Sequence, residues 1–528
     1  MGIAISGIYT LTNMNYLKAL KLNWQILTFL FLAALLTFQS CKKKKARSDM
    51  GKELYDKTHN KVFKDITPEG FAPVFQKVLA EQGSKLPYYK LISNWYSQND
   101  YDPVFIMDHL KNEDLRNLTA FLESATDHGL DPKMFQAGKI QLLLSRFYDK
   151  KAIKNTAQAY QDMAELEMLV ANAAIKYSSA MQYGVMNPRR IYANYFTATK
   201  HPDTAVLMHV FDVKDLHSYL DSLQPKNSQY IALQKFLKSG QTAPGLTKEE
   251  TQRILVVNLE RLRWKNKPTE NKYVIVNIPD YHLDVMENAR SVLGMKVCVG
   301  EGRNIDQSNT LVDYDEGDKT DRPFSRETPQ LNSLIYVAEV NPVWNIPSSI
   351  AVKEIMDLAM KDRYYLSNKG IDVYKNGQKI EDSETIDWDE VKNNPDAYSF
   401  KQQPGAENAL GKIKFLFPNK TNVYLHDTPA QLPFKQDMRA VSHGCVRLEK
   451  PLDFAHAMFG DGSKYDTIVK DMSEDNATPT QIALPKKVPV YITYVTCWAD
   501  ENNAVQFRKD VYGLDIVLYA HMQRFFSA

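Results

Sequence analysis

A histidine, a cysteine and an arginine alternate in the stretch "VSHGCVRLEK" (441–450), and these residue types at this spacing could form a nucleophilic site. His443 stands two places before Cys445, and Arg447 stands two places after it. A free cysteine has a pKa of about 8.5, so its thiol needs activation before it attacks a carbonyl at neutral pH. A second histidine, His426, ends the strand-like run "TNVYLHD" upstream. If that run pairs with the strand of Cys445, thiol and imidazole would lie together as nucleophile and base.

As a cysteine, Cys445 could also be a metal ligand or a buried structural thiol. Structural zinc sites use about four ligands, commonly spaced C-x-x-C or H-x-x-x-H. Neither spacing occurs in the chain. A buried structural cysteine rarely stands in a polar turn that contains a glycine, as Gly444 does here. That glycine would let the backbone N–H groups of Gly444 and Cys445 turn toward a developing oxyanion. We therefore expect acyl-transfer chemistry with no metal and no organic cofactor.

Short β-type segments dominate the chain from Tyr273 onward and must position this site. The run "YVIVNIPDYHLDVME" alternates on both sides of Pro279 and Asp280, which predicts a hairpin. Further strand-like runs are "GMKVCVG", "SLIYVAEV", "IKFLFPN", "NVYLHD" and "VPVYITYV". A long polar loop (300–329) and an aromatic-rich, partly helical insertion interrupt them. We expect a mostly-β catalytic domain over 269–500, with a capping insertion over about 351–398.

Helical periodicity dominates the preceding part, which we expect to be a helical scaffold domain over 63–268. Thr247 and Glu250 form a capping box ahead of "RILVVNLERLRW". Apolar residues recur at helical spacing in two further stretches, Leu115, Leu118, Leu122 and Ala125, and Leu166, Leu169, Val170, Ala173 and Tyr177. The predicted fold class is therefore α+β, a helical domain followed by a mostly-β domain. We expect residues 501–528 to form a C-terminal tail.

The N-terminus has the pattern of an export signal. Lys18 and Lys21 precede the apolar run "WQILTFLFLAALLTF", which is short for a membrane-spanning helix but suits a signal-peptide core. Cys41 follows a small residue, an arrangement that resembles the lipobox of bacterial lipoproteins. We expect a lipoprotein-type signal peptide over 1–41, with lipidation of Cys41, and a polar tether over 42–62. The protein would then be exported and anchored to a membrane, facing the periplasm. An uncleaved anchor and a signal peptide cut elsewhere remain alternatives.

Composition excludes several other classes of protein. Of 528 residues, 44% are hydrophobic and 24% are charged, which indicates a folded chain of more than one domain. The net charge is +2 and no basic stripe runs through the body, so we expect no nucleic-acid partner. Cys298 and Cys497 stand in strand-like runs and are expected to be small buried residues. A disulfide between these two cysteines is left open.

At "SHGCVRL" (442–448) and "YLHDTP" (424–429) the chain resembles the catalytic signature of the L,D-transpeptidases with a YkuD-type domain. Four other segments are similar to the YcbB-like subgroup of that family: "HGLDP", "NLERLRW", "VNPVWNIPSSIA" and "QQPGAENALGKIKF". The similarity covers roughly residues 65–500. One departure is the short segment near 239–248, where members of the subgroup often carry an inserted peptidoglycan-binding module. Attachment to the wall would then depend on the lipid anchor and the insertions.

The resemblance implies a role for each residue of the signature. Cys445 corresponds to the acylated nucleophile, and His426 corresponds to its general base, oriented by the backbone carbonyl of Asp427. Glycine or serine is commoner at that position. The difference changes nothing essential if only the carbonyl is used, but a carboxylate close to the imidazole would raise the pKa of the ring. Arg447 would hold the catalytic loop or a substrate carboxylate, with an internal salt bridge as the alternative. Gly444 would supply the oxyanion hole through its backbone. The other residues implied in substrate binding are Tyr424, His443 and Trp344.

The function that the resemblance implies is that of a peptidoglycan L,D-transpeptidase in cell wall biogenesis. Its cysteine would form a thioester with a tetrapeptide stem, and the diaminopimelate amine of a second stem would then attack to give a 3→3 cross-link. The capping insertion would exclude water from the thioester, and carbapenems would acylate the same cysteine. L,D-carboxypeptidase action or attachment of a protein to the wall would use the same residues. A non-catalytic wall-binding scaffold lipoprotein is a further alternative.

Overall fold

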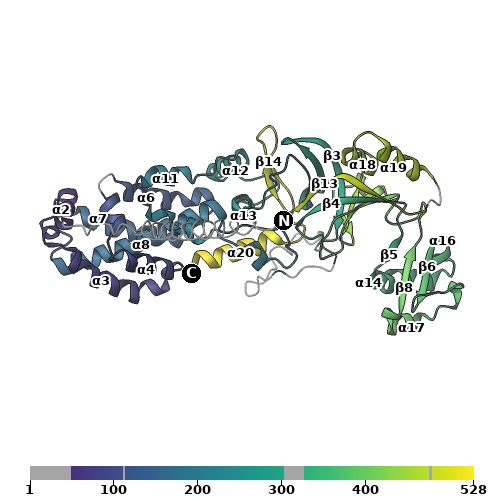
Figure 1. Cartoon of the computed structure of the whole chain (residues 1–528), viewed down its shortest axis with the longest axis horizontal. Helices are drawn as coiled ribbons and strands as arrows, with labels where there is room; N and C mark the ends of the chain where they lie inside the picture. Colours follow the sequence, from purple (N-terminus) through teal and green to yellow (C-terminus); the bar gives the residue numbers. More distant parts are fainter. Residues whose placement is uncertain (1–48, 111–112, 303–320, 322–325, 475–477, 528) are drawn as a thin grey trace, which may run out of the picture. The chain divides into compact units, whose positions relative to one another are not determined.

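The structure is a computed structural model that describes residues 49–110, 113–302, 321, 326–474 and 478–527. Helices make up the chain as far as Arg263 and strands dominate after it, so the fold is α+β, as predicted (Figure 1). The chain forms two compact units, Met1–Asp108 with Ser145–Met168, and His109–Leu144 with Leu169–Ala528. The expected signal peptide and its Cys41 lie outside the described residues. In the part that the structure describes, no helix has the length and apolar character needed to cross a membrane.

The first unit is a helical body around a core of aromatic rings. Phe75 stacks on Phe71 and meets the edge of the Tyr96 ring. The polar tether expected over 42–62 is wrong from Met50 onward, because the first helix buries Met50 and Leu54. The helices of this unit are α2 (Met50–Thr58), α3 (Pro68–Glu81), α4 (Tyr89–Gln98), α5 (Val104–His109) and the first part of α8 (Thr156–Tyr183).

The second unit begins with helices whose ends follow the sequence signals. The long helix α8 ends at Gly184, which has a φ of +78°. The capping box at α13 is confirmed: the hydroxyl of Thr247 accepts the N–H of Glu250, whose side chain accepts the N–H of Thr247. The helices here include α6 (Asp114–Glu123), the first part of α7 (Ala137–Tyr148), α9 (Pro188–Ile191), α10 (Thr204–Met208), α11 (Leu216–Ser222), α12 (Ser228–Ser239) and α13 (Lys248–Arg263).

The strands that follow form a sheet that closes on itself. Their order is β11-β3-β12-β10-β9-β4-β13-β1-β2, and β2 also pairs with β3, so the sheet becomes a barrel. The predicted hairpin is confirmed, since β1 and β2 pair in antiparallel fashion. The strands are β1 (Lys272–Asn277), β2 (His282–Glu287), β3 (Arg290–Gly300), β4 (Leu331–Val340), β9 (Ile413–Leu416), β10 (Leu425–His426), β11 (Ala440–Ser442), β12 (Val446–Leu448) and β13 (Thr480–Thr493).

Alternate residues of these strands fill the barrel. Val274 and Val276 of β1 and Leu283 and Val285 of β2 are fully buried, whereas their neighbours are partly exposed. Two helices lie beside the sheet in Figure 1, α18 (Pro451–Phe459) and α19 (Ser463–Ser473). The barrel core and α18 meet through aromatic rings, Phe415 of β9 and Phe454 of α18, whose centroids lie 4.8 Å apart edge to face.

An insertion between β4 and β9, here called the cap, has a hydrophobic core of its own. Its sheet has the order β5-β8-β6-β7, so the cap extends beyond the predicted span of 351–398 on both sides. The cap elements gather together in Figure 1. They are β5 (Trp344–Ile346), α14 (Ser348–Ile350), the π-helical segment η7 (Ala351–Ile355), α15 (Met356–Lys361), α16 (Tyr365–Asn368), β6 (Ile371–Lys375), β7 (Gln378–Lys379), α17 (Trp388–Asn393) and β8 (Tyr398–Gln402).

The segment predicted as a C-terminal tail is part of the packed second unit, so that prediction is wrong. It contributes β15 (Val505–Phe507), which pairs with β14 (Cys497–Ala499), and helix α20 (Leu514–Ser527). Most residues of α20 are buried, because the helix packs against its surroundings on several sides. Asp515 of this helix forms a buried ion pair with Arg261 of α13 at 2.5 Å.

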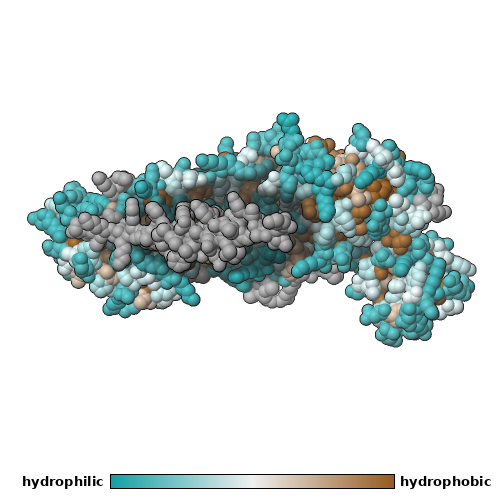
Figure 2. Space-filling model, in the orientation of Figure 1, coloured by the Kyte–Doolittle hydropathy of each residue, from teal (hydrophilic) through white to brown (hydrophobic). Residues whose placement is uncertain are grey.

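The face of the molecule shown in Figure 2 is mostly hydrophilic, and hydrophobic side chains gather over its β-rich part. Large exposed hydrophobic residues on the barrel strands are Val292, Leu334 and Tyr336. Isolated apolar residues of this kind are normal on protein surfaces.

Candidate active site

The paired strands β10 and β12 bring the predicted residues together on one face of the sheet. The two strands run parallel, with Leu425 opposite Val446 and His426 opposite Arg447. Leu425 and Val446 are both fully buried in the barrel. Since side chains alternate along a strand, the opposite face carries the chemical groups. On the strands these are His426 and Arg447, and Tyr424 and Cys445 each stand one residue before a strand, two places from His426 and Arg447.

Cys445 is half-buried among polar side chains from neighbouring strands. The hydroxyl of Tyr424 interacts with its thiol, and the charges of Arg447 and Lys414 also act on it. Burial raises the pKa of the Cys445 thiol to about 11, even though these neighbours act in the opposite direction. The resting thiol is therefore protonated at neutral pH. Attack on a carbonyl requires that a base remove its proton.

His426 is held in one orientation by the main chain. Its Nδ1 donates to the carbonyl oxygen of Asp427 at 2.5 Å, which leaves Nε2 of the neutral ring to accept a proton. Burial lowers the pKa of His426 to about 3, and the charge of Arg447 acts in the same direction. Within the described residues no hydrogen bond joins this ring to the Cys445 thiol. The two side chains lie diagonally on paired strands, and such contacts often tighten only when substrate binds.

The carboxylate of Asp427 is turned away from the imidazole. It accepts the backbone N–H of Lys412 at 2.8 Å and that of Thr428 at 2.7 Å. Gly411 makes room for it, since a Cβ on Gly411 would lie 2.4 Å from the Asp427 carboxyl carbon. The expectation that this carboxylate raises the pKa of His426 is therefore wrong. The carbonyl of Asp427 contacts the ring, in the place where the resemblance implies it.

The turn before Cys445 is held by a hydroxyl group. Ser442 Oγ donates to the carbonyl of Cys445 at 2.5 Å and accepts the N–H of Gly444 at 3.1 Å. Gly444 has a φ of +111°, which residues with a side chain rarely adopt. Because its N–H is used inside the turn, Gly444 does not supply the expected oxyanion donor. The N–H of Cys445 has no partner among the described residues and is the better candidate.

Arg447 lies between the strands that flank β12. It is opposite Cys298 on β3 and opposite His426 on β10. Its Nε is buried without a hydrogen-bond partner. The internal salt bridge that was the alternative role is not found among the residues that the structure describes. A guanidinium without a carboxylate partner beside the thiol is suited to bind a carboxylate of the substrate.

His443 contacts the cap. Its Nε2 lies 2.8 Å from Oε1 of Glu354, on the π-helical segment η7. Arg326 pairs with the same Glu354 carboxylate and, at 3.1 Å, with Glu301. The turn over residues 442–445, called the catalytic turn from here on, is thus joined to the cap through charged side chains. Single π-helical turns are rare and occur often at functional sites.

Trp344 and the two remaining described cysteines complete the set of predicted residues. Trp344 of β5 packs against the core of the cap, which gives it a packing role there. Cys298 and Cys497 are both buried, as expected, and their thiols are free, so the disulfide left open between them is not formed. Cys298 shares the sheet face of Arg447, and burial raises the pKa of its thiol to about 11.

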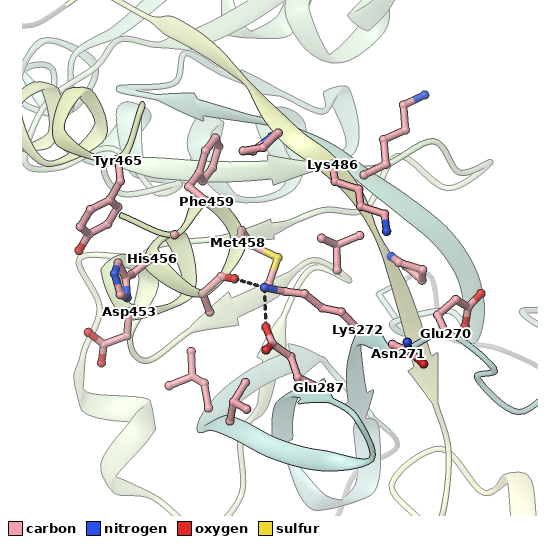
Figure 3. A pocket seen from close by; sticks show the side chains of 18 residues that line it. Glu270, Asn271, Lys272, Glu287, Asp453, His456, Met458, Phe459, Tyr465 and Lys486 are labelled. Carbon is pink, nitrogen blue, oxygen red and sulfur yellow. Dashed lines mark hydrogen bonds and ion pairs between the residues drawn. The ribbon is translucent and has the colours of Figure 1, made fainter. Parts of the chain in front are cut away.

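A cavity of about 1070 Å³ lies elsewhere in the second unit, among β1, β3, α18 and β13 (Figure 3). Lys272 lies between the Glu287 carboxylate, at 2.7 Å, and the carbonyl of Ala457, at 2.6 Å. His456 pairs with Asp461 at 2.8 Å. None of the lining residues is a cysteine, serine or threonine. The cavity therefore offers none of these nucleophiles, and Cys445 is not among its lining residues.

Several residues of the site were not predicted. Ser442 stands inside the quoted motif, and a hydroxyl two places before a glycine is a recognisable turn signal. Lys414 lies opposite His426 on β9 and pairs with Glu339 at 2.9 Å. Glu354 comes from an insertion whose docking no local pattern reveals.

Comparisons with known proteins match two segments of the chain. Residues 271–464 match the family described as L,D-transpeptidase catalytic domain (YkuD), and residues 90–237 match the family described as scaffold domain. A protein of Haemophilus influenzae named "Putative L,D-transpeptidase" is 29% identical over 261 residues, 49% of this chain and 48% of that protein. The chain thus spans about half the length of the curated relative it matches. The assignment to a YcbB-like subgroup stays a prediction.

One solved structure is also similar in part. It is the structure of the Ldtfm–avibactam carbamoyl enzyme, 12% identical, with 42% of this chain and 49% of that chain covered and a TM-score of 0.18. A TM-score this low supports no argument about fold or function. The similarity to the YkuD and scaffold families therefore depends on the two matched segments.

Proposed function

We propose, from the match of residues 271–464 to the YkuD family, that the protein is a peptidoglycan L,D-transpeptidase that forms 3→3 cross-links through a thioester on Cys445. One observation carries the proposal. The shared face of β10 and β12 gathers a thiol, an imidazole oriented by a carbonyl, and a guanidinium without a carboxylate partner among the described residues. This set is sufficient for nucleophilic acyl transfer without a metal.

In the first half-reaction the Cys445 sulfur attacks the carbonyl that joins the L-centre of diaminopimelate to the terminal D-alanine of a tetrapeptide stem. The thiol proton passes to Nε2 of His426, and the N–H of Cys445 stabilises the oxyanion. Collapse of the tetrahedral intermediate breaks the amide C–N bond. The D-alanine amine leaves with the proton from His426, and a thioester remains on Cys445.

In the second half-reaction the side-chain amine of diaminopimelate in another stem attacks the thioester. His426 takes a proton from this amine and returns it to the departing Cys445 thiolate, so the enzyme is regenerated. Arg447 binds a carboxylate of the donor stem. The cap limits the access of water, which would otherwise hydrolyse the thioester to a tripeptide.

The test incubates purified protein with disaccharide-tetrapeptides and identifies the products by mass spectrometry. Wild-type protein should give a dimer that has lost one D-alanine, and Cys445→Ser should give none. The Cys445→Ser variant should also lose the covalent adduct that a carbapenem forms with the wild type. Tripeptide as the sole product would make the protein a carboxypeptidase, and turnover by Cys445→Ser would contradict the assignment of the nucleophile.

We also propose that the protein is an exported lipoprotein anchored through Cys41 and facing the periplasm. The support is the apolar run before Cys41 in the sequence. A fatty-acid analogue fed to cells should label the wild type and fail to label Cys41→Ala. Absence of label in the wild type would exclude the lipid anchor.

A further inference from the structure

Thr328 lies in the segment just before β4, buried against the catalytic turn. It is 2% exposed. Its hydroxyl donates to the carbonyl oxygen of Gly444 at 2.8 Å and accepts the backbone N–H of Gly300 at 2.8 Å. Both hydrogen-bonding functions of this hydroxyl are therefore used, and one of them acts on the residue next to Cys445.

Tyr512 holds the backbone of Thr328 in place. The N–H of Thr328 donates to the Tyr512 hydroxyl at 3.1 Å, and this hydroxyl donates to the carbonyl of Gly300 at 2.8 Å. Tyr512 is 1% exposed, and burial raises the pKa of its hydroxyl, so it keeps its proton. Tyr512 belongs to the C-terminal segment, which thereby reaches the catalytic turn through Thr328.

Gly300 is what allows this close approach. A Cβ on Gly300 would lie 1.9 Å from the carbonyl oxygen of Arg326 and 2.7 Å from the nitrogen of Thr328. Any side chain at this position would push the segment of Thr328 away from the end of β3. The hydroxyl of Thr328 could then no longer reach Gly444.

The peptide between Gly444 and Cys445 is held from its carbonyl side. In a trans peptide the C=O and the N–H point in opposite directions. The hydroxyl of Thr328 holds the carbonyl of Gly444, so the N–H of Cys445 is directed to the other side of the same plane. Ser442 already occupies the N–H of Gly444 and the carbonyl of Cys445.

We propose that Thr328 is a positioning residue for acyl transfer, and that Tyr512 supports it. Through the carbonyl of Gly444, Thr328 directs the N–H of Cys445 at the oxyanion that forms when the thiol attacks. The inference deepens the proposed function and rests on Cys445 being its nucleophile. Neither Thr328 nor Tyr512 touches the substrate in this proposal.

The test separates two reactions of the same thiol in the full-length protein. Acyl transfer from a nitrophenyl ester forms an S–C bond, breaks the ester C–O bond and releases nitrophenolate, and it passes through an oxyanion. Alkylation by iodoacetamide displaces iodide and forms no oxyanion. Loss of one oxyanion donor costs about 10²- to 10³-fold in rate. Thr328→Val should therefore slow acylation by about 100-fold and leave the alkylation rate within about twofold of wild type.

Thr328→Ser keeps the hydroxyl and should restore acylation to within a few-fold of wild type. Thr251→Val is the matched control, because it removes a hydroxyl of α13 that is 1% exposed, donates to the carbonyl of Thr247 and accepts the N–H of Ala243. It should acylate at the wild-type rate. If Thr328→Val does not fold, Tyr512→Phe replaces it and should slow acylation in the same selective way.

Three results would overturn the inference: wild-type acylation by Thr328→Val, a parallel fall of acylation and alkylation, or no rescue by Thr328→Ser. The ester needs no stem peptide. A wild-type protein that reacts with the ester and not with tetrapeptide would therefore contradict the proposed function while leaving the role of Thr328 to be decided by the variants.

Discussion

The thiol of Cys445 and the imidazole of His426 are both neutral at rest, and this determines how they react. Burial raises the pKa of the thiol to about 11 and lowers the pKa of the imidazole to about 3. A thiolate–imidazolium pair would need a thiol pKa below the pKa of the imidazole. In the proposed reaction the proton would therefore leave the sulfur as the bond to the carbonyl carbon forms, with His426 as general base and without a preformed thiolate.

This neutral pair predicts an unusual pH profile for alkylation of Cys445. The rate with iodoacetamide should be low at pH 7 and rise about tenfold per pH unit up to at least pH 9, since the thiolate is the reactive form. Because the raised pKa lies near 11, no plateau should occur below pH 10. Stopped alkylation followed by mass spectrometry measures the rate, with Cys445→Ser as the control. A plateau below pH 8 would contradict the neutral pair.

Among the elements, the cap and the catalytic turn are linked by a small number of charges. Although burial alone would raise it, contacts with His443 and Arg326 hold the pKa of the Glu354 carboxyl below its usual value. Glu354 is therefore ionised at neutral pH and can bind both partners. The π-helical segment η7 presents this carboxylate. Partly exposed ion pairs of this kind contribute about 0–1 kcal/mol each. That is enough to favour contact between the cap and the catalytic turn, and too little to fix the cap in one position.

Glu354→Gln should weaken this link and favour water over the acceptor amine. We expect the ratio of tripeptide to cross-linked dimer to rise a few-fold, while acylation of Cys445 stays close to wild type. The matched control is Glu384→Gln, which removes a carboxylate that pairs with Arg363 inside the cap. Raised salt should bring the product ratio of the wild type closer to that of Glu354→Gln, because salt screens exposed charges. An unchanged product ratio would exclude the link as a determinant of transfer.

Structural features that depend on neighbouring residues could be predicted from the sequence. Features that depend on long-range packing could not. The capping box at Thr247 and the strands around His426 and Cys445 depend on short patterns of hydrogen-bonding groups and alternation, so both could be predicted. The rotamer of Asp427 could not, because it depends on Gly411 and the N–H of Lys412. Thr328 reaches Gly444 across a large sequence separation, and no periodicity records such a contact.

At the scale of the whole second unit, the C-terminal helix is tied to the rest by buried charge. Asp515 of α20 is 1% exposed and binds Arg261, which is 4% exposed, as well as the hydroxyl of Thr496. A polar network of this kind in the interior is costly to break, because the remaining charge is left buried without a partner. The C-terminal segment therefore supports both the stability of the unit and, through Tyr512, the catalytic turn.

Asp515→Ala should lower the free energy of unfolding by about 3–5 kcal/mol, because it leaves the Arg261 guanidinium buried and unpaired. Denaturant titration followed by circular dichroism measures the change. Asp461→Ala is the control: Asp461 pairs with His456, and its side chain is 98% exposed. That substitution should change stability by less than about 0.5 kcal/mol. Equal effects of the two substitutions would show that the buried ion pair contributes no more to the free energy of unfolding than the exposed one.

The cap leaves and rejoins the barrel at adjacent points. Val340, the last residue of β4, lies opposite Ile413, the first of β9, and the N–H of Asn341 donates to the carbonyl of Lys412 at 2.8 Å. A tight turn could bridge the same two strand ends. Recombination could therefore excise or exchange the insertion as one cassette, with every barrel strand kept intact. The cap and the barrel strands beside Cys445 and His426 could accordingly change independently of each other within one polypeptide.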